Sequence, residues 1–477
     1  MAINSTKRFS LSLEPAPAWT AIIGIIFLGL VGAVPPLGRF VTLLFPLASL
    51  GVGFFLYNSY PILYLGFTWW LWFLTPFVRR LADMGGVYTE PSPILLTPFL
   101  VTALCLITLY KQIPKLNRLG KLGTPFILAL IGLSYSFLVG TLTRTPPKLS
   151  IASLDWLTPV VFGFHIYVNW RNYPEYKRNF ERVFLYGVLF VGIYGIIQYL
   201  ILPQWEVNWL RNAPIDSICD GGFEALKCRV YSTLNSPEPF AGFMSAGLLL
   251  LLCSTSRLCM PAQIAVYLSF LLAMVRSSWL GWAVGFLFLI FSLKEKFQIR
   301  LIAVFLAIAL CIVPMTQIEQ FSGITERFST FSSLESDGSA SARQDTYEEV
   351  IGEALTNWLG GGLGGRQYDS TLLALLMNLG WVGTTFYMGG VLFLISNLFY
   401  QSASSNDAFA TATRGVVMTI IARLPLNSPL AGVQGIIFWA FLGIGVAAHR
   451  YHQHQKSLLR KQMQEQYIHR KRSIMSG

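Results

Sequence analysis

Long apolar runs alternate with short polar segments along nearly the whole chain of 477 residues. An apolar run of about 20 residues is long enough to cross a bilayer as an α-helix. The run 371–399 is long enough to be tilted or broken, and the run 413–425 is short and interrupted by Arg423 and Pro425. The pattern predicts an all-α, polytopic integral membrane helix bundle of about 12 to 14 transmembrane helices. The candidate spans are 18–34, 40–57, 61–78, 93–110, 125–142, 152–168, 183–202, 239–253, 258–275, 278–293, 300–314, 371–399, 413–425 and 433–448.

Composition excludes a soluble domain. Charged residues make up 12% of the chain and hydrophobic residues 54%, whereas a soluble domain carries roughly 25% charged residues. The net charge of +12 could indicate nucleic-acid binding, but the basic residues cluster in short loops and in a tail. Contact with membrane lipids explains them better, so we expect no nucleic-acid partner. No small-residue cleavage site follows the first run, which we interpret as a retained helix.

The basic segments predict the orientation of the chain. Segments 111–121, 171–182 and 294–300 are basic, and the tail after Ala448 has seven Lys and Arg residues against one Glu. Basic loops stay in the cytoplasm. If the chain crosses the membrane once at each candidate span, these segments and the N-terminus all lie on the same side, so both termini are expected to be cytoplasmic.

This orientation places two long polar segments, 203–238 and 315–370, outside. The second carries nine acidic residues and three arginines, which suits an extracytoplasmic loop containing short amphipathic helices. Cys219 and Cys228 share the first segment, in the stretch "CDGGFEALKC". In an oxidising compartment they are expected to form a disulfide, although two free thiols are the alternative.

The stretch "VRSSWLGW" (275–282) places Arg276 at an outward turn between two spans. An arginine in mid-bilayer costs about 3 kcal/mol, and a position at the boundary lowers this cost. Arg276 is therefore either an interfacial anchor or a ligand-binding residue. Five tryptophans are expected to form interfacial belts rather than to stack on sugars; they are Trp69, Trp70, Trp72, Trp279 and Trp282.

Four stretches on the predicted outer side follow one another in a particular order and spacing. They are "RVYSTLNSPEPFAGF" (229–243), "VRSSWLGW" (275–282), "SARQDTYEEVIGEALTNWLGGGLGG" (341–365) and "YDSTLLALLMNLGWVG" (368–383). Together they resemble the O-antigen ligase and O-antigen polymerase family of bacterial envelope glycosyltransferases. The resemblance covers about 229–390, a third of the chain.

The resemblance implies an activity and a location. Members of that family act on glycans carried by a polyprenyl diphosphate, such as undecaprenyl diphosphate, at the outer face of the bacterial cytoplasmic (inner) membrane. They transfer the glycan to another glycan, a lipid or a protein during assembly of surface polysaccharide (O-antigen, exopolysaccharide or capsule). The expected division is 1–182 for N-terminal transmembrane helices, 183–448 for the ligase- or polymerase-like region with both outer segments, and 449–477 for a basic cytoplasmic tail.

Such a reaction needs cations for the leaving diphosphate and a base for the acceptor hydroxyl. Guanidinium groups bind phosphate oxygens in pairs and can replace a metal ion, so no metal or cofactor is expected. By the resemblance, Arg229 and Arg276 bind diphosphate, and Arg343, Arg366 and Asn235 contribute to binding diphosphate or glycan. The alternative for the arginines is a loop position with surface partners.

The base departs from the family pattern, because many ligases carry a His-Asn pair where this chain has Tyr368-Asp369-Ser370. None of the five histidines can stand in, since His165 is near a cytoplasmic span end and the others lie in the tail. Polymerase-like members often have Asp at this place. Asp369 is therefore expected to act as the base or to orient the hydroxyl, with a nearby arginine such as Arg366; the alternative is a helix N-cap.

The glycine stretch 360–365 lacks the Gly-Lys-Ser/Thr ending of a phosphate loop and is expected to be a turn that closes the outer loop onto the membrane.

Two alternatives to an enzyme stay open. A membrane transporter or transport-associated protein, for bicarbonate or a lipid-linked sugar, is the main one. A non-catalytic envelope assembly protein is the other.

Overall fold

The architecture is given by a computed structural model that describes most of the chain. The described residues are 14–114, 123–213, 218–219, 221–254, 256–293, 295, 298–299, 302, 338–366, 368–400, 404 and 407–475. They form helices joined by connecting segments, and no β-strand occurs among them. Eight of the described helices are long and apolar enough to cross a membrane, and five shorter ones are also apolar. The all-α polytopic membrane fold is thus confirmed, while the predicted span 300–314 lies almost wholly outside the described residues.

The chain divides into two compact units, Met1–Val101 and Thr102–Gly477. The helices of the first unit, with the boundary helix last, are α1 (Ala16–Val31), α2 (Gly38–Ser59), α3 (Pro61–Met84), η1 (Pro93–Leu96) and α4 (Thr97–Ala103). Helices α1, α2 and α3 pack on one another, and η1 packs against α2 and α3. The boundary between the units falls inside α4, well before residue 182.

Three of the five tryptophans expected in interfacial belts are buried in the protein. Trp69 and Trp72 on α3 are 0% and 2% exposed, and Trp279 is 7% exposed. The Trp72 ring meets the Phe99 ring edge-on, with centroids 4.7 Å apart. The belt interpretation is wrong for these three because an amphipathic ring packs equally well in a helix interface, and the run of hydrophobic residues alone does not show which face meets another helix.

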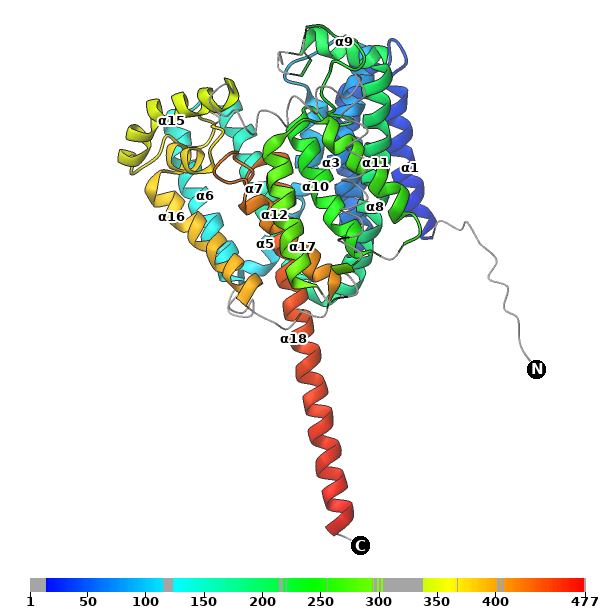
Figure 1. Cartoon of the computed structure of the whole chain (residues 1–477), viewed down its shortest axis with the longest axis vertical. Helices are drawn as coiled ribbons and strands as arrows, with labels where there is room; N and C mark the ends of the chain where they lie inside the picture. Colours follow the sequence, from blue (N-terminus) through cyan, green and yellow to red (C-terminus); the bar gives the residue numbers. More distant parts are fainter. Residues whose placement is uncertain are drawn as a thin grey trace, which may run out of the picture. The chain divides into compact units, whose positions relative to one another are not determined.

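The second unit contains the candidate site. Its helices are α5 (Cys105–Gln112), α6 (Thr124–Thr143), α7 (Pro146–Val168), η3 (Trp170–Asn172), α8 (Tyr173–Ile201), α9 (Gln204–Asn212), α10 (Pro237–Cys253), α11 (Cys259–Leu272), α12 (Arg276–Ser292), α15 (Gly338–Thr356), α16 (Thr371–Tyr400), α17 (Ala408–Ile421) and α18 (Gly432–Met475). The main packed pairs are α7 with α18, α6 with α16, α8 with α11, and α12 with α17. Figure 1 shows these helices coloured by sequence.

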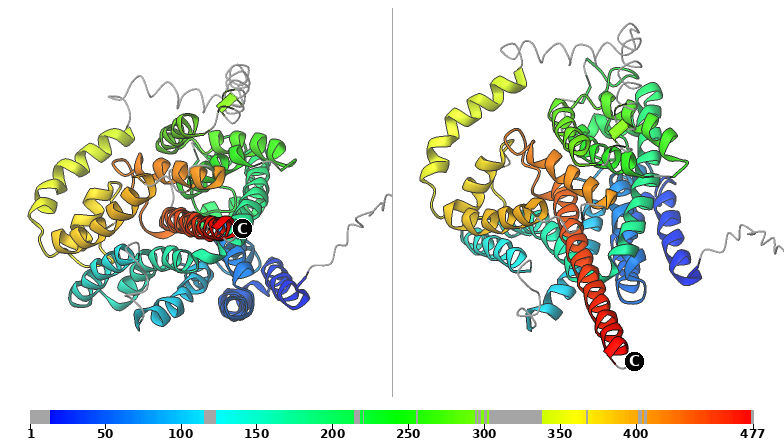
Figure 2. Two further views of the ribbon diagram at one scale, coloured as in Figure 1. Left: turned by 90° about the horizontal axis from the view of Figure 1, so that it is seen from below. Right: turned by 60° about the horizontal axis from the view of Figure 1, so that its bottom comes forward.

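Helices α7 and α18 cross with their backbones in contact. A Cβ atom on Gly163 would overlap the carbonyl oxygen of Trp439, and one on Gly443 would overlap that of Gly163. In lipid, where the hydrophobic effect does not drive helices together, small residues permit this close van der Waals packing. The apolar part of α18 is 89% buried inside the protein, so α18 is the central helix of the unit (Figure 2).

The helix ends of the second unit gather in two groups. One group, which we call the site end, consists of segments 229–238, 273–276, 366–371 and 423–434. It contains the starts of α10, α12, α16 and α18 and the ends of α11 and α17, joined by hydrogen bonds. All four stretches that carry the family resemblance begin or end in or beside this group.

The opposite group, the tail end, joins α8, α17 and α18. Tyr173 and Lys177 of α8 donate hydrogen bonds to Asp407, which precedes α17. His452 of α18 contacts the same carboxylate. Beyond it the basic tail continues α18 as one helix, whose residues 456–469 are exposed (Figure 1).

Candidate functional site

The stretch that leads into α10 is fixed by a disulfide and by its backbone. Cys219 and Cys228, the pair expected from their shared polar segment, are joined by a disulfide. Two residues later, Val230 donates its backbone N–H to the Leu272 carbonyl at the end of α11 (3.0 Å). Arg229, between the disulfide and this hydrogen bond, is therefore held against the end of α11.

The side chain of Arg229 is tied to the turn between α11 and α12. Its Nε donates to the carbonyl of Ala273 (3.1 Å) and its Nη2 to the carbonyl of Met274 (3.3 Å). Carbonyl groups at a helix C-terminus lack intrahelical partners and carry partial negative charge, so a guanidinium is stabilised there. Arg229 thus fixes the turn that leads into α12.

Arg276 is the first residue of α12, two residues after Met274. Met274 has a φ of 54°, and this left-handed residue turns the chain sharply from α11 into α12. Trp279 anchors the new helix through its Nε1, which donates to the Phe270 carbonyl (3.3 Å). The structure therefore places Arg229 and Arg276, two arginines 47 positions apart (276 − 229 = 47), on one turn.

Arg276 adds its own positive charge to the N-terminus of α12. A helix N-terminus carries partial positive charge, and a cation there loses about 0.3–1 kcal/mol. The side chain is half-buried, so water screens this repulsion only in part. An anion bound at this turn would be attracted by the Arg276 side chain and by the start of α12 together.

Asn235 lies just before α10, where Ser236 is the N-cap residue and Pro237 the first helical residue. The Asn235 Oδ1 is buried and accepts no hydrogen bond within the described part of the chain. A buried amide oxygen without a donor costs about 1–3 kcal/mol. Such an atom at the predicted site suits a ligand hydroxyl or a water molecule.

Three polar residues from three helices meet at the site end. Arg423, just after α17, is 0% exposed. Its Nη2 lies 3.2 Å from Glu238 Oε1 in the first turn of α10, and its Nη1 donates to Gln434 Oε1 at the start of α18 (2.9 Å). The Gln434 Nε2 donates in turn to the Glu238 backbone carbonyl (3.0 Å). These three residues, which we call the Arg423 cluster, connect α10, α17 and α18.

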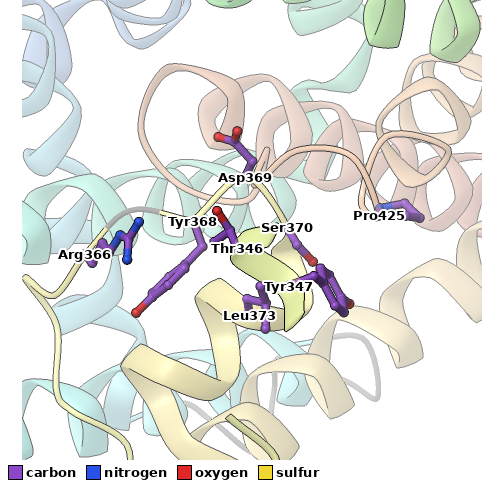
Figure 3. Close-up of a pocket in the computed structure, with 8 residues that line it drawn as sticks. All are labelled: Thr346, Tyr347, Arg366, Tyr368, Asp369, Ser370, Leu373 and Pro425. Atoms are coloured by element: carbon purple, nitrogen blue, oxygen red, sulfur yellow. The ribbon is translucent and has the colours of Figure 1, made fainter. Parts of the chain in front are cut away.

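Asp369 lies in a pocket of about 160 Å³. The residues that line it are Thr346, Tyr347, Arg366, Tyr368, Asp369, Ser370, Leu373 and Pro425. Figure 3 shows the Asp369 carboxylate pointing away from the other labelled side chains. The side chain is exposed, so a polar molecule at the protein surface can reach the carboxylate.

The start of α16 is anchored beside this pocket. Ser370 occupies the cap position, since its carbonyl accepts the N–H of Ala374 (2.9 Å). Thr371 donates its N–H to the Leu424 carbonyl (3.1 Å) and its hydroxyl to the Asn427 carbonyl (2.7 Å). The loop after Arg423 therefore joins the pocket to the Arg423 cluster, and Asp369 stands one residue before the cap position.

The other two predicted arginines are placed differently. The Arg366 guanidinium lies over the Tyr368 ring, 5.9 Å from its centroid, and the side chain is exposed. It borders the same pocket as Asp369, but the two side chains extend in different directions (Figure 3). Arg343 lies on α15, and its side chain is outside the described part of the structure.

Helix α15 and the glycine stretch cover the start of α16. Tyr347, Ile351 and Ala354 of α15 pack against a cluster around Leu373 and Leu376. Within the long segment 315–370, residues 338–366 and 368–370 are described, and α15 is their helix.

The glycine stretch is a hydrogen-bonded turn. Gly361 donates its N–H to the Met377 carbonyl (2.8 Å), and Leu363 donates to the Ser136 carbonyl on α6 (3.3 Å). Gly360 has a φ of 80°, and a Cβ there would collide with the backbone at Gly380. Gly380 itself has a φ of 64° and breaks α16, as the length of the run 371–399 indicated.

The Arg423 cluster was not predicted from the sequence. Glu238 stands inside the stretch 229–243, and Arg423 interrupts an apolar run. An ionisable residue within an apolar run is by itself a signal of a functional site. That signal could have identified Arg423, but it does not name Glu238 or Gln434 as its partners.

The site end combines groups of both charges. Four helices begin there and add partial positive charge to that of Arg229, Arg276 and Arg423, whereas the ends of α11 and α17 add partial negative charge. Two carboxylates, Glu238 and Asp369, lie in the same group of helix ends. Arginines and carboxylates near one another can bind a phosphorylated group and a hydroxyl group together. No protein-family model and no curated protein matches this sequence.

Proposed function

We propose that the protein is a membrane glycosyltransferase that acts on glycans linked to a polyprenyl diphosphate. The observation that carries this proposal is the turn shared by Arg229 and Arg276 at the start of α12. A diphosphate bound there would meet a guanidinium at a helix N-terminus, where charge and hydrogen-bond donors favour phosphate oxygens. The family resemblance of the four stretches supports the same reading.

The proposed chemistry assigns each residue a task. The acceptor hydroxyl attacks the anomeric carbon of the donor glycan, and the bond from that carbon to the diphosphate breaks. The leaving diphosphate gains negative charge, which Arg276 stabilises most effectively where water is excluded. Arg229 holds the turn and adds positive charge, while Asn235 accepts a hydrogen bond from a sugar hydroxyl.

Asp369 is proposed to act on the hydroxyl group of the acceptor glycan. Its open pocket admits a sugar, and the carboxylate either accepts the hydroxyl proton or orients the hydroxyl. With aspartate where many ligases have histidine, we favour polymerisation of lipid-linked units over transfer to lipid A core sugars. We place the site end on the outer face of a bacterial cytoplasmic membrane, with both termini inside, on the strength of the basic loops.

The test is a glycan analysis of a strain that lacks this protein. Surface polysaccharide length and the pool of lipid-linked oligosaccharides are measured after complementation with wild type, Arg276→Ala or Arg211→Ala. Arg211 is an exposed arginine of α9 and serves as the matched control. We expect loss of long polymer and accumulation of single lipid-linked units, reversed by wild type and Arg211→Ala.

Arg276→Ala should fail to reverse the defect, with polymer reduced at least about 100-fold. Immunoblots of the membrane fraction verify equal amounts of each variant. Unchanged polysaccharide and unchanged lipid-linked pools in the deletion strain contradict the proposal, and Arg276 is then an interfacial anchor. A non-catalytic assembly protein predicts instead a defect that Arg276→Ala still reverses.

One observation favours transport as a second candidate. Asp155 lies within the span of α7, and a Cβ on Gly432 would come within 3.6 Å of its carboxylate. Acidic residues inside spans commonly mark ion or substrate pathways. Uptake of labelled bicarbonate by the deletion strain and by an Asp155→Asn strain tests this candidate, and uptake equal to wild type in both excludes it.

A further inference from the structure

The Arg423 cluster is poorly explained as a device for stability. Arg423 is 0% exposed, and its Nε has no hydrogen-bond partner among the residues that the structure describes. Removing a guanidinium from water costs several kcal/mol, and a buried ion pair often stabilises a protein no more than apolar residues of similar volume. A fold that needed only packing at this position would be better served by an apolar side chain.

The two residues of the Arg423–Glu238 ion pair also differ in their exposure. The Arg423 side chain is 1% exposed, whereas the Glu238 side chain is 42% exposed. The guanidinium is thus sealed inside the protein, while the carboxylate that it holds is open to molecules at the site end. Gln434 binds the arginine and the Glu238 backbone carbonyl together, so Arg423 holds the carboxylate while Gln434 holds the backbone of the same residue.

The cluster shares two helices with the proposed diphosphate site. Glu238 follows Asn235 by three residues in the stretch that leads from Arg229 into α10. On α12, Gly281 lies five residues after Arg276, and a Cβ there would press on the Arg423 side chain at 2.8 Å. Arg423 therefore lies against α12 within about two turns of Arg276, since a helix rises about 1.5 Å per residue.

We propose that Glu238 is the catalytic base of the transfer and that Arg423 is the residue that positions it. The inference rests on the proposed glycosyltransferase function. The acceptor oxygen forms the new bond to the anomeric carbon, and the diphosphate departs with the electrons of the old one. The hydroxyl proton passes to the Glu238 carboxylate and then to water. Carboxylates perform this task in inverting glycosidases.

This assignment separates the roles of the two carboxylates. Glu238 pairs with Arg423, which lies against α12, the helix that begins at Arg276, and we place the leaving group and the anomeric carbon there. Asp369 lies in the pocket that Pro425, in the loop after Arg423, also lines. Asp369 then orients the acceptor glycan, and Glu238 takes its proton.

The experiment uses the full-length protein in proteoliposomes. Two probes are measured: binding of undecaprenyl diphosphate, and elongation of the lipid-linked oligosaccharide extracted from the deletion strain. The variants are Glu238→Gln and Glu238→Asp, with Glu224→Gln as control. Glu224 is an acidic residue of the same outer segment, 66% exposed and paired with Lys227.

We expect Glu238→Gln to bind undecaprenyl diphosphate as the wild type does and to elongate 10²- to 10⁴-fold more slowly, about the range of general base catalysis. Glu238→Asp, which retracts the carboxylate by one methylene, should retain partial kcat and the same KM. This variant decides the outcome if Glu238→Gln does not fold. Elongation by either folded variant at the wild-type rate overturns the inference and leaves the glycosyltransferase proposal standing.

The positioning role of Arg423 has its own readout. Arg423→Lys keeps the charge and should keep part of kcat, whereas Arg423→Gln should lower kcat about as far as Glu238→Gln with the KM for the donor unchanged. Equal activity in Arg423→Gln and Arg423→Lys contradicts positioning by charge. If the wild type itself binds the probe but never elongates the oligosaccharide, the proposed function fails and the role of Glu238 fails with it.

Discussion

Arg229 donates a hydrogen bond from its Nε to the backbone carbonyl of Ala273, at 3.1 Å. The bond joins two segments that are 44 positions apart in the sequence, and it occurs at the C-terminus of α11. It means that the arginine proposed to bind diphosphate also determines the geometry of the turn that carries Arg276. A single change at Arg229 therefore affects the local structure and the ligand site together.

The first prediction distinguishes the two arginines. Arg229→Ala should lower the free energy of unfolding by about 1–2 kcal/mol, because two hydrogen bonds from a charged group to helix-end carbonyls are lost. Arg276→Ala should cost less stability than Arg229→Ala, since removing a cation from a helix N-terminus offsets part of the contacts that are lost. Thermal unfolding in detergent measures both, and undecaprenyl diphosphate binding should fall in both. An unchanged Tm for Arg229→Ala contradicts the structural role.

The second prediction concerns the disulfide, which closes a segment with a sequence separation of 9. By the entropy of loop closure, Cys219→Ser should destabilise the protein by about 2–3 kcal/mol. Because the disulfide needs an oxidising compartment, neither cysteine should react with maleimide in intact cells before reduction. Reaction of both thiols without reductant would place this segment in the cytoplasm and reverse the proposed orientation. Cys259, which is free and buried, reports unfolding in the same assay.

The third prediction tests the pocket of Asp369. This side chain is exposed, so Asp369→Asn should change stability by less than about 0.5 kcal/mol. If Asp369 orients the acceptor glycan, the variant should raise the KM for the acceptor roughly 10-fold or more, with a smaller effect on kcat. Glu353→Gln, on the exposed face of α15, is the control. A kcat loss at unchanged KM would transfer the role of base from Glu238 to Asp369.

The fold could be predicted largely from the sequence because bilayer thickness sets the length of every apolar run. The break in α16 was also foreseeable, since the run 371–399 exceeds one span. The two compact units were not, because their boundary inside α4 depends on which helices pack together. For the same reason, the pattern of apolar residues could not distinguish a buried Trp69 from an interfacial one.

The site was predictable only in its local parts. The stretches whose order resembles the family contain Arg229, Asn235 and Arg276. The structure holds Arg229 and Arg276 on one turn. Arg423 and Glu238 are 185 positions apart, and nothing in a single sequence pairs two residues at such a distance. Their contact follows from the packing of α17 against α10 and α12, in which Gly281 provides the space for the arginine.

The fourth prediction concerns pH and the tail end. Burial by itself raises the pKa of the Asp407 carboxyl, but hydrogen bonds from His452, Tyr173 and Lys177 together hold it well below its ordinary value of 3.8. A carboxyl with a lowered pKa stabilises the fold fully above its unfolded pKa, and this contribution is lost as pH falls through the folded pKa.

Asp407→Asn, which keeps a capping side chain, should therefore cost about 2 kcal/mol at pH 7, in the range of a lost hydrogen bond to a charged group, because Lys177 and His452 are partly exposed. The Tm difference from wild type should shrink as pH falls below 3.8, the ordinary pKa of the carboxyl. Unfolding scans from pH 3 to pH 7 measure it. A difference that widens toward low pH would show that the carboxylate is not stabilised in the folded protein.

The fifth prediction uses two glycines that differ in what surrounds them. Gly163 faces the α18 backbone, where a Cβ would overlap the Trp439 carbonyl, whereas a Cβ on Gly389 of α16 meets nothing within 4 Å. Gly163→Ala should destabilise the protein by about 1–3 kcal/mol, because α7 and α18 must move apart. Gly389→Ala removes backbone freedom from the unfolded chain without a clash and should stabilise by about 0.4–1 kcal/mol. Thermal unfolding of both variants in one detergent decides the matter, and equal Tm values would mean that α7 and α18 do not cross at Gly163.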